Sequence, residues 1–300
     1  MDYALISRST VPIYILPGTK TVKEGRSFTA IADEGLYGMG VRITGEEQNG
    51  YLPILTHYGY PGYICAAAVI RKSIGEMKSR EAQPLCVVDA IFADVTNEPS
   101  VNGVILTSLP KGALVQLNRF DTGTAWAEIS LLDGQHGYIR KQFLQEKVFS
   151  QCGLWETALP QRPAIMDEAS FRSGVVNEAK KYLGVQYRWG GKSTLGLDCS
   201  GLTSMCYMLQ GALIYRDACI EPGYPIREIP LADKLPGDLL YFPGHIALYM
   251  GDGRYIHSTG LEGSGGVVIN SLDPGANDYR VDLAENIYAA GSLFAGEEKL

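Results

Sequence analysis

A weak internal repeat is the feature that most restricts how the first half of this chain can fold. In each copy a β-type run begins with an aromatic residue, and a Gly-Tyr-Ile motif begins 11 residues after it. The two copies lie 75 residues apart. They comprise Tyr51-Leu-Pro-Ile54 with Gly62-Tyr63-Ile64, and Trp126-Ala-Glu-Ile129 with Gly137-Tyr138-Ile139. Short β-type runs broken by Gly, Pro and Asn surround both copies. The pattern predicts two small β-barrels, residues 1–74 and residues 75–150.

Residues 151–167 contain Pro160 and Pro163, mixed charge and no periodicity, which predicts a linker. The apolar positions that follow at helical spacing are Val175, Val176, Ala179, Tyr182 and Leu183. They predict a helix that Gly184 ends. The strands expected further along are 238–242, 245–250 and 254–258. Helices followed by an antiparallel sheet predict an α+β fold for residues 168–300.

The composition excludes several kinds of partner. The 26 basic and 33 acidic residues give a net charge of -7 without any Lys/Arg run, so we expect no nucleic acid partner. No run approaches the roughly 18 apolar residues of a membrane span, so we expect no membrane partner. The N-terminus lacks a signal-peptide pattern, which predicts a cytoplasmic protein, or a secreted one if a leader has been removed. The six cysteines form no Cys-x-x-Cys pair, so we expect reduced thiols, no metal and no cofactor.

Cys199 differs from the other cysteines because it stands at the start of a predicted helix. The apolar residues that follow at helical spacing are Leu202, Met205, Cys206 and Leu209. Gly211 ends the pattern. A helix N-terminus presents unpaired backbone N–H groups and the positive end of the macrodipole, which favour a thiolate over a thiol. Cys199 is therefore a candidate nucleophile, and the alternative is the small buried side chain that most cysteines provide.

A nucleophilic cysteine needs a base, and the base needs a group that orients it. Of the four histidines, His57 and His136 fall in the predicted barrels, which leaves His245 and His257. A three-residue loop at 251–253 would place both rings on one sheet face as diagonal neighbours, roughly 7–8 Å apart at their Cα atoms. A two-residue Asp-Gly loop would place them on opposite faces. We expect His245 to be the base and His257 to orient it.

Five ordered motifs resemble the series found in NlpC/P60 cysteine peptidases. They are Tyr187-Arg-Trp189-Gly190-Gly191, Asp198-Cys199-Ser200-Gly201, Pro236-Gly237-Asp238-Leu239, His245-Ile-Ala-Leu-Tyr-Met-Gly251 and Tyr255-Ile-His257. The resemblance spans residues 168–295 and implies a papain-like fold with a triad of Cys199, His245 and His257. The repeat in the first half resembles bacterial SH3-like (SH3b) domains, whose final strand often carries a Gly-aromatic-Ile/Val signature.

With two such modules before the peptidase unit, the chain is similar to the γ-D-glutamyl-L-diamino acid endopeptidases. That resemblance implies a murein peptide substrate with a free N-terminal L-Ala. The bond cut would follow L-Ala-γ-D-Glu and precede meso-diaminopimelate or L-lysine, during recycling of cell-wall peptides. The resemblance also implies that Asp198 and Ser200 hold the dipeptide.

Physical arguments suggest further roles in the site. The oxyanion of an acyl transfer needs hydrogen-bond donors, and the Cys199 backbone N–H and the Tyr187 hydroxyl are candidates. Asp198 could also be only a helix N-cap, a role worth about 1 kcal/mol. Trp189 is expected to line the cleft, with core packing as the alternative. Asp238 is expected to be a turn residue without a chemical role.

Two positions depart from the family pattern. Relatives carry an acidic residue, which binds the substrate amine, where Leu36-Tyr37-Gly38-Met39 has methionine. The nearby acidic candidates are Glu34, Glu46 and Glu47. In addition, Arg216-Asp217-Ala218 has alanine where relatives often carry a cleft serine.

Two other functions stay open at this point. An amidase or acyltransferase could use the same scaffold, because the triad chemistry serves all acyl transfers. The chain could also be a non-catalytic cell-wall binding protein that uses its two SH3-like modules.

Overall fold

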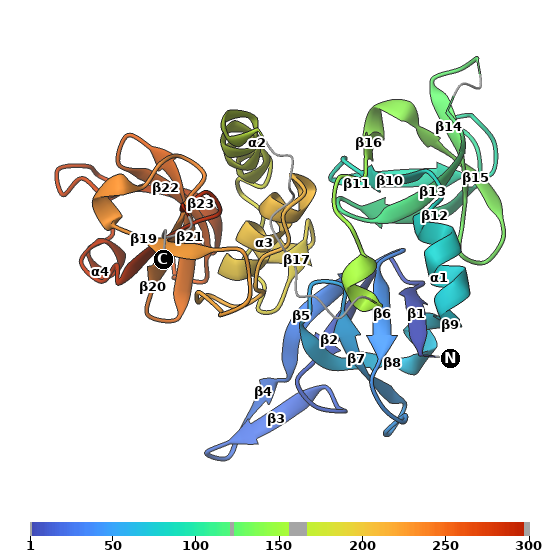
Figure 1. Cartoon of the computed structure of the whole chain (residues 1–300), viewed down its shortest axis with the longest axis horizontal. Coiled ribbons are helices and arrows are strands. Elements are labelled where there is room, and N and C mark those ends of the chain that lie inside the picture. Colours follow the sequence, from blue (N-terminus) through green and yellow to red (C-terminus); the bar gives the residue numbers. More distant parts are fainter. Residues whose placement is uncertain (1, 121–122, 156–166, 297–300) are drawn as a thin grey trace. The chain divides into compact units, whose positions relative to one another are not determined.

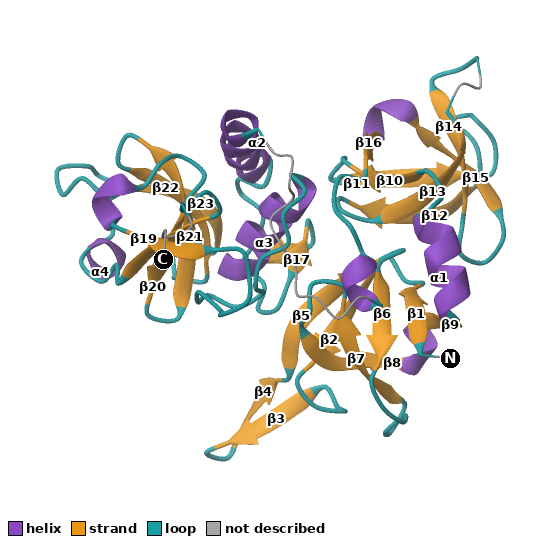
Figure 2. Cartoon of the chain, in the orientation of Figure 1, coloured by secondary structure: helices purple, strands orange, loops and turns teal. Residues whose placement is uncertain are grey.

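The computed structural model describes residues 2–120, 123–155 and 167–296, which belong to two compact units, 1–157 and 158–300 (Figure 1). The first unit is mostly strand and contains both copies of the repeat, whereas the second combines helices with a six-stranded sheet (Figure 2). No described helix is both long and apolar enough to cross a membrane.

The first unit contains two seven-stranded antiparallel sheets. The strands of the first are β1 (Tyr3–Ile6), β2 (Thr10–Tyr14), β5 (Ile31–Leu36), β6 (Gly40–Ile43), β7 (Tyr51–Thr56), β8 (Pro61–Cys65) and β9 (Val69–Lys72). Those of the second are β10 (Leu85–Val88), β11 (Phe92–Thr96), β12 (Ile105–Pro110), β13 (Leu114–Arg119), β14 (Trp126–Ser130), β15 (His136–Arg140) and β16 (Leu144–Glu146). A two-stranded ribbon, β3 (Lys20–Lys23) and β4 (Arg26–Thr29), extends from the first sheet (Figure 1).

The sequence repeat is a duplication of structure. The strand order is β5-β2-β8-β7-β6-β1-β9 in the first sheet and β12-β11-β15-β14-β13-β10-β16 in the second, so each strand has a counterpart at the same place. The repeated hairpins also share one register, because Tyr51 lies opposite Cys65 and Trp126 lies opposite Arg140. The sequence therefore located a true repeat from a few positions in each copy.

The glycine of each Gly-Tyr-Ile motif is required by close packing. A Cβ on Gly62 would come within 2.4 Å of the Ile13 side chain, and a Cβ on Gly137 within 2.4 Å of Val95. These contacts occupy matching places in the two sheets, so the same neighbouring strand fills the space that a side chain would need.

The expected closed barrels are not present in the described residues, because each sheet is open and its two edge strands do not pair with each other. In the first sheet the edge strand β9 ends where Ser73 caps α1 (Ile74–Glu81) in a capping box with Glu76. The chain thus leaves the sheet before a closing ladder can form. In the second sheet the edge strand β16 has only three residues.

The segment Leu36-Tyr37-Gly38-Met39 joins the two sheets. The Leu114 N–H donates to the Tyr37 carbonyl at 2.8 Å, and the Leu132 N–H donates to the Tyr37 hydroxyl at 2.7 Å. A Cβ on Gly38 would come within 2.0 Å of the Leu114 carbonyl oxygen. Met39 is buried in this joint. A packing role therefore accounts for the methionine at the position where an acid was expected.

The beginning of the expected linker packs on the first unit. The Gln151 side chain accepts a hydrogen bond from the Gly40 N–H at 2.7 Å, and Leu154, in the 3₁₀ turn Cys152–Leu154, is buried. Residues 156–166 of that linker lie outside the described residues. Asp167 is the N-cap of α2 (Glu168–Lys180) and accepts a hydrogen bond from the Ser170 N–H.

The second unit is an α+β fold. Its six-stranded antiparallel sheet has the order β19 (Arg227–Ile229), β24 (Ala289–Ser292), β20 (Leu239–Phe242), β21 (His245–Gly251), β22 (Arg254–Thr259) and β23 (Gly266–Ser271). The ribbon of β17 (Lys192–Ser193) and β18 (Gly196–Leu197) leads into α3 (Cys199–Leu209). One sheet face packs on α2 and α3, and the other packs on the short helix α4 (Val281–Ala284). The expected strands and both expected helices are therefore present.

The prediction that Leu183 lies on the apolar face of the first helix is wrong. The helix α2 ends at Lys180, and the chain turns toward Gly184, which has a positive φ of 80°. Tyr182 remains buried after this turn, but Leu183 is 47% exposed. Leu183 lies beyond the end of the helix, so its helical spacing no longer directs it to the core.

Candidate active site

Cys199 is the first residue of α3, as the sequence predicts. Asp198 caps this helix, and its carboxylate accepts the Gly201 N–H at 2.6 Å. A Cβ on Gly201 would come within 2.0 Å of the Gly191 carbonyl oxygen, so glycine lets the helix start against that segment. Backbone hydrogen bonds from Ile246 and Ser200 reach the Cys199 sulfur. The sulfur therefore lies at the beginning of β21.

The predicted preference for a thiolate is wrong. Burial, and after it the charge of Asp198, raises the pKa of Cys199 to about 11. Hydrogen bonds from the Ile246 and Ser200 backbone and the charge of Arg216 lower the pKa, but by less. The side chain is so enclosed that loss of water outweighs the helix terminus. Cys199 is therefore a thiol at neutral pH, and its attack requires a base that removes the proton.

The two candidate histidines lie on one face of a hairpin, but the turn differs from the expected one. The turn of β21 and β22 has two residues, Asp252–Gly253, both with positive φ. A bulge at Met250 inserts one residue into β21 and shifts the register. The bulge cancels the change of face that a two-residue loop alone would cause. The expectation for the faces is confirmed, and the expectation for the loop is wrong.

A chain of hydrogen bonds fixes which nitrogens of the two rings carry protons. The Asn270 amide nitrogen donates to the Asp278 carbonyl at 2.6 Å, which leaves its oxygen 2.8 Å from His257 Nε2. His257 Nε2 therefore carries a proton, and in the neutral ring Nδ1 accepts. His257 Nδ1 lies 2.7 Å from His245 Nε2, so His245 Nε2 is the donor in that contact. His245 Nδ1 is left with a lone pair that can accept a proton.

Both rings are neutral at ordinary pH. Burial, and then the neighbouring His257, lowers the pKa of His245 to about 3. Burial lowers the pKa of His257 to about 4, although the hydrogen bond that its Nε2–H donates to Asn270 acts in the opposite direction. A neutral His245, one residue before the Ile246 N–H that binds the Cys199 sulfur, is suited to general-base chemistry.

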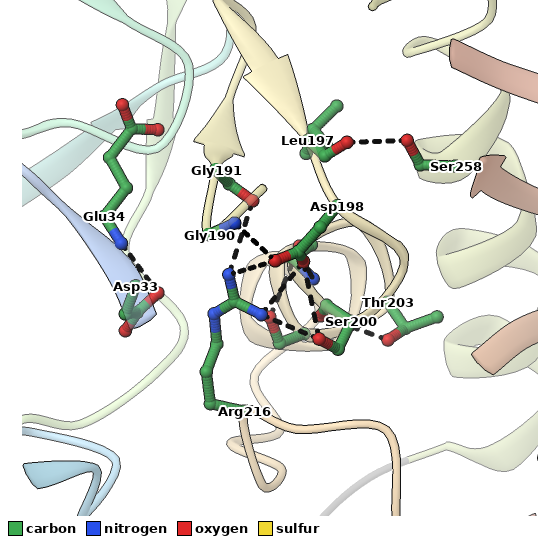
Figure 3. Close-up of polar contacts among 12 residues, drawn as sticks. Asp33, Glu34, Gly190, Gly191, Leu197, Asp198, Ser200, Thr203, Arg216 and Ser258 are labelled. Atoms are coloured by element: carbon green, nitrogen blue, oxygen red, sulfur yellow. Dashed lines mark hydrogen bonds and ion pairs between the residues drawn. The ribbon is translucent and has the colours of Figure 1, made fainter. Parts of the chain in front are cut away.

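Arg216 holds the residues on both sides of Cys199 (Figure 3). Its Nη1 and Nη2 lie 3.0 Å from the two carboxylate oxygens of Asp198, and Nη1 donates to the Ser200 hydroxyl at 2.7 Å. The Gly190 N–H also donates to Asp198, at 2.8 Å. The N-cap reading of Asp198 is confirmed, while substrate binding by Asp198 and Ser200 stays a prediction. Arg216 is itself buried, so this is a desolvated ion pair.

Tyr187 and Trp189 occupy different environments. Tyr187 is half-buried, and burial, followed by the nearby Cys199 and Asp198, raises the pKa of its phenol. It is therefore a neutral O–H donor close to the nucleophile. Trp189 is 63% exposed, so the core-packing alternative is wrong for this residue.

The remaining candidates are the three acidic residues proposed for the substrate amine and the turn residue Asp238. Glu34 is buried, whereas Glu46 and Glu47 are exposed and Glu47 lies 3.5 Å from Arg71. Asp238 accepts the Leu235 N–H in a turn, as expected, and also pairs with Arg172 at 2.8 Å.

Arg216 and Asn270 are the two partners that sequence reasoning missed. Each carried a weak signal: Arg216 follows an apolar run, 212–215, and Asn270 interrupts the β-branched strand β23. No cluster of three or more His, Cys, Asp or Glu side chains suited to a metal occurs within the described parts of the chain.

Sequence comparisons find relatives of this chain that are named as peptidases. A profile of the NlpC/P60 family matches residues 184–282. Dipeptidyl-peptidase 6 of Lysinibacillus sphaericus is 41% identical over 267 residues, which cover 88% of this chain and 92% of that protein. A gamma-D-glutamyl-L-lysine dipeptidyl-peptidase of Bacillus cereus is 30% identical over 200 residues, which cover 58% of this chain and 54% of that protein.

Comparison of structures supports the fold. The crystal structure of an NlpC/P60 family protein from Bacillus cereus has a TM-score of 0.71 at 21% identity and covers 96% of this chain and 98% of that one. An NlpC/P60 endopeptidase from Photobacterium damselae has a TM-score of 0.64 at 12% identity, over 96% of this chain and 72% of that one. The expected papain-like fold is confirmed for the second unit.

Proposed function

Because this chain belongs to the NlpC/P60 family of cysteine peptidases, we propose that it hydrolyses the γ-D-glutamyl–diamino acid bond of murein peptides. The substrate would be L-Ala-γ-D-Glu followed by meso-diaminopimelate or L-lysine. The observation that carries the proposal is the hydrogen-bonded series His245–His257–Asn270, which begins one residue before Ile246, whose backbone N–H binds the Cys199 sulfur. The name of the Bacillus cereus relative supports the γ-D-glutamyl bond.

The first chemical step forms a thioester. His245 Nδ1 takes the thiol proton while the Cys199 sulfur bonds to the γ-carbonyl carbon of D-Glu. The oxyanion that forms accepts hydrogen bonds from the Cys199 backbone N–H at the helix start and from the Tyr187 hydroxyl. His257 holds the charged ring through its Nδ1. The same proton then passes to the amine of the diamino acid, which leaves as the carbon–nitrogen bond breaks.

The second step consumes water. His245 removes a proton from a water molecule, which attacks the thioester carbon, and the proton returns to the sulfur as the carbon–sulfur bond breaks. The products are the dipeptide L-Ala-D-Glu and the shortened peptide that begins with the diamino acid. No step needs a metal or a cofactor.

The N-terminal repeats are proposed to be SH3-like modules. Their support is the shared strand order and the Gly-Tyr-Ile register in two open sheets. We further propose that the peptidase requires a free L-Ala amine, which would restrict it to turnover fragments and to a role in recycling. Glu34, Glu46 and Glu47 remain the acidic candidates for that amine.

The direct test is incubation with L-Ala-γ-D-Glu-meso-diaminopimelate and separation of the products. Release of L-Ala-D-Glu supports the proposal, and its absence from the reaction removes it. The N-acetylated tripeptide is the matched control for the amine, and we expect it to be cleaved far more slowly. Transfer of the dipeptide to an added amine, without hydrolysis, would instead favour an acyltransferase.

A cell-wall binding protein without activity is the second alternative. A thiol-alkylating probe distinguishes it, because a working site must admit a small electrophile to Cys199. We expect Cys199 to be labelled ahead of the fully buried Cys206. Equal labelling of the two would favour the binding protein.

A further inference from the structure

A cavity in the first unit is lined by none of the residues of the candidate active site. Its volume is about 710 Å³, within the range of roughly 300–1,000 Å³ that is typical of small-molecule sites. It lies between α1 and the second sheet, and its lining includes Leu5, Tyr37, Lys72, Arg80, Leu114 and Leu131. The lining thus combines apolar side chains with two cationic ones and the carboxylate of Glu76.

Arg80 has an unusual environment for a charged side chain in this cavity. Its Nε is shut off from solvent and has no hydrogen-bond partner. Neither Nη atom makes a hydrogen bond or an ion pair with any residue in 2–120, 123–155 or 167–296. Burial lowers the pKa of Arg80, but a guanidinium stays charged. The side chain as a whole is only partly buried, but a buried N–H without an acceptor costs free energy, which an anion in the cavity would offset.

The acidic residues on the same helix are already occupied. Glu81 accepts hydrogen bonds from Lys147 at 2.6 Å and from the Gln151 backbone at 3.1 Å. Glu76 closes the capping box with Ser73 and accepts from Lys72 at 3.1 Å. Lys72 is therefore hydrogen-bonded to an acid, whereas Arg80 feels the charge of Glu81 without a hydrogen bond to it.

Tyr37 adds a second unused donor to the cavity. Its hydroxyl accepts the Leu132 N–H, which leaves the O–H proton available. Across the parts of the chain that the structure describes, this proton has no acceptor. Arg80 and Tyr37 are thus donors without acceptors, beside the apolar side chains of Leu5 and Leu114.

We propose that this cavity binds an organic oxyanion, with a carboxylate or phosphate group on Arg80 and Tyr37 and an apolar part against Leu5 and Leu114. A planar guanidinium matches both groups because it can donate two parallel hydrogen bonds to two oxygens. The site is independent of the peptidase reaction and gives the first unit a ligand of its own.

The first test needs no ligand. Arg80→Met keeps most of the side-chain volume and removes the buried N–H that has no acceptor, so we expect the melting temperature to rise by about 2–4 °C. Lys72→Met is the matched control, because it removes the paired cation of the same cavity, and we expect no rise. A fall of several degrees for Arg80→Met would mean that Arg80 stabilises the fold through contacts of its own, and would overturn the proposal.

The second test titrates the full chain with N-acetyl-L-leucine, phenyl phosphate and the neutral N-acetyl-L-leucinamide, followed by calorimetry. We expect at least one anion to bind saturably to the wild type and to Lys72→Met, at least ten-fold more weakly to Arg80→Met, and the amide not to bind. The stronger anion identifies whether the ligand is a carboxylate or a phosphate. Absence of saturable binding by either anion, or equal binding by Arg80→Met, would overturn the proposal.

Discussion

The core of the second repeat and the junction of α3 with β21 are both closely packed, but they bury different chemistry. The repeat buries aliphatic side chains such as Val95, Ile129 and Ile139. The junction buries a thiol, an imidazole and an ion pair, in Cys199, His257 and Asp198 with Arg216. Burial of such groups lowers stability unless each has a partner, so a fold retains them where they serve a reaction. Changes in the repeat should therefore affect stability, and changes at the junction should affect rate.

Removal of the reacting groups should give the largest effect. We expect Cys199→Ala and His245→Ala to lower kcat/KM by roughly 10³-fold or more, with little change in melting temperature. His257→Ala should retain measurable activity, because it orients the base and does not carry the proton. Release of L-Ala-D-Glu measures all three, and equal and complete loss in all three would contradict this ranking.

The ion pair of Asp198 and Arg216 is an exception, because it lies at the junction but its loss should lower stability. Arg216→Met leaves Asp198 buried without its partner, so we expect the free energy of unfolding to fall by about 3–5 kcal/mol. Arg71→Met removes an exposed ion pair with Glu47 and should change it by less than about 1 kcal/mol. Denaturant unfolding compares the two variants. Similar small losses in both would mean that the buried pair contributes no more than a surface pair.

The glycines of the two Gly-Tyr-Ile motifs test whether changes in the repeats affect stability and not rate. Gly62→Ala and Gly137→Ala each introduce a Cβ within 2.4 Å of a packed side chain, so each should cost about 1–3 kcal/mol. Gly137→Ala should leave kcat/KM within about two-fold, because the core around it contains no member of the triad. Thermal unfolding and product release measure these effects. Clearly unequal losses of stability would show that the two copies are packed differently.

Asn270 should have a moderate effect on rate. Asn270→Leu removes the acceptor that fixes the His257 tautomer, and we expect kcat/KM to fall about ten-fold. Asn270→Asp keeps an acceptor for the same proton and should retain more activity than leucine. Asn286→Leu, which removes an amide bonded to the Asp282 carbonyl, is the control and should be near wild type. The reverse order of the leucine and aspartate variants would remove the orienting role.

The smallest effect concerns pH near neutrality. Because burial keeps the pKa of His245 at about 3 and that of His257 at about 4, both rings stay neutral until the medium is strongly acidic. We expect kcat/KM to be level from about pH 5 to 8 and to fall only below about pH 4. Stability should decline earlier, as pH falls below about 6.5, because only the unfolded chain then takes up protons on these rings. An acid limb of kcat/KM near pH 6.5 would show that His245 is not desolvated.

Local patterns predicted the elements of the peptidase unit well. The start of α3 at Cys199 follows from the cap at Asp198 and the apolar spacing after it. The shared face of His245 and His257 was also correct, although the reason was incomplete. A bulge at Met250 restores the face that the two-residue turn would have changed. The alternation of apolar and polar side chains does not predict this bulge.

The missed features all depend on tertiary structure. The pKa of Cys199 rises because segments distant in sequence enclose it, so the helix terminus alone predicted the wrong direction. Arg216 and Asn270 gain their roles from partners that only the fold supplies. The open sheets likewise reflect where the chain leaves the edge strands, which strand propensity does not specify.

Acid quenching of the wild-type enzyme during turnover of L-Ala-γ-D-Glu-meso-diaminopimelate, followed by peptide mass spectrometry, tests the proposed nucleophile most directly. We expect the L-Ala-γ-D-Glu acyl group on the peptide that contains Cys199, released by hydroxylamine and absent from Cys199→Ala. Acyl label on another residue, or full turnover by Cys199→Ala, would contradict this assignment.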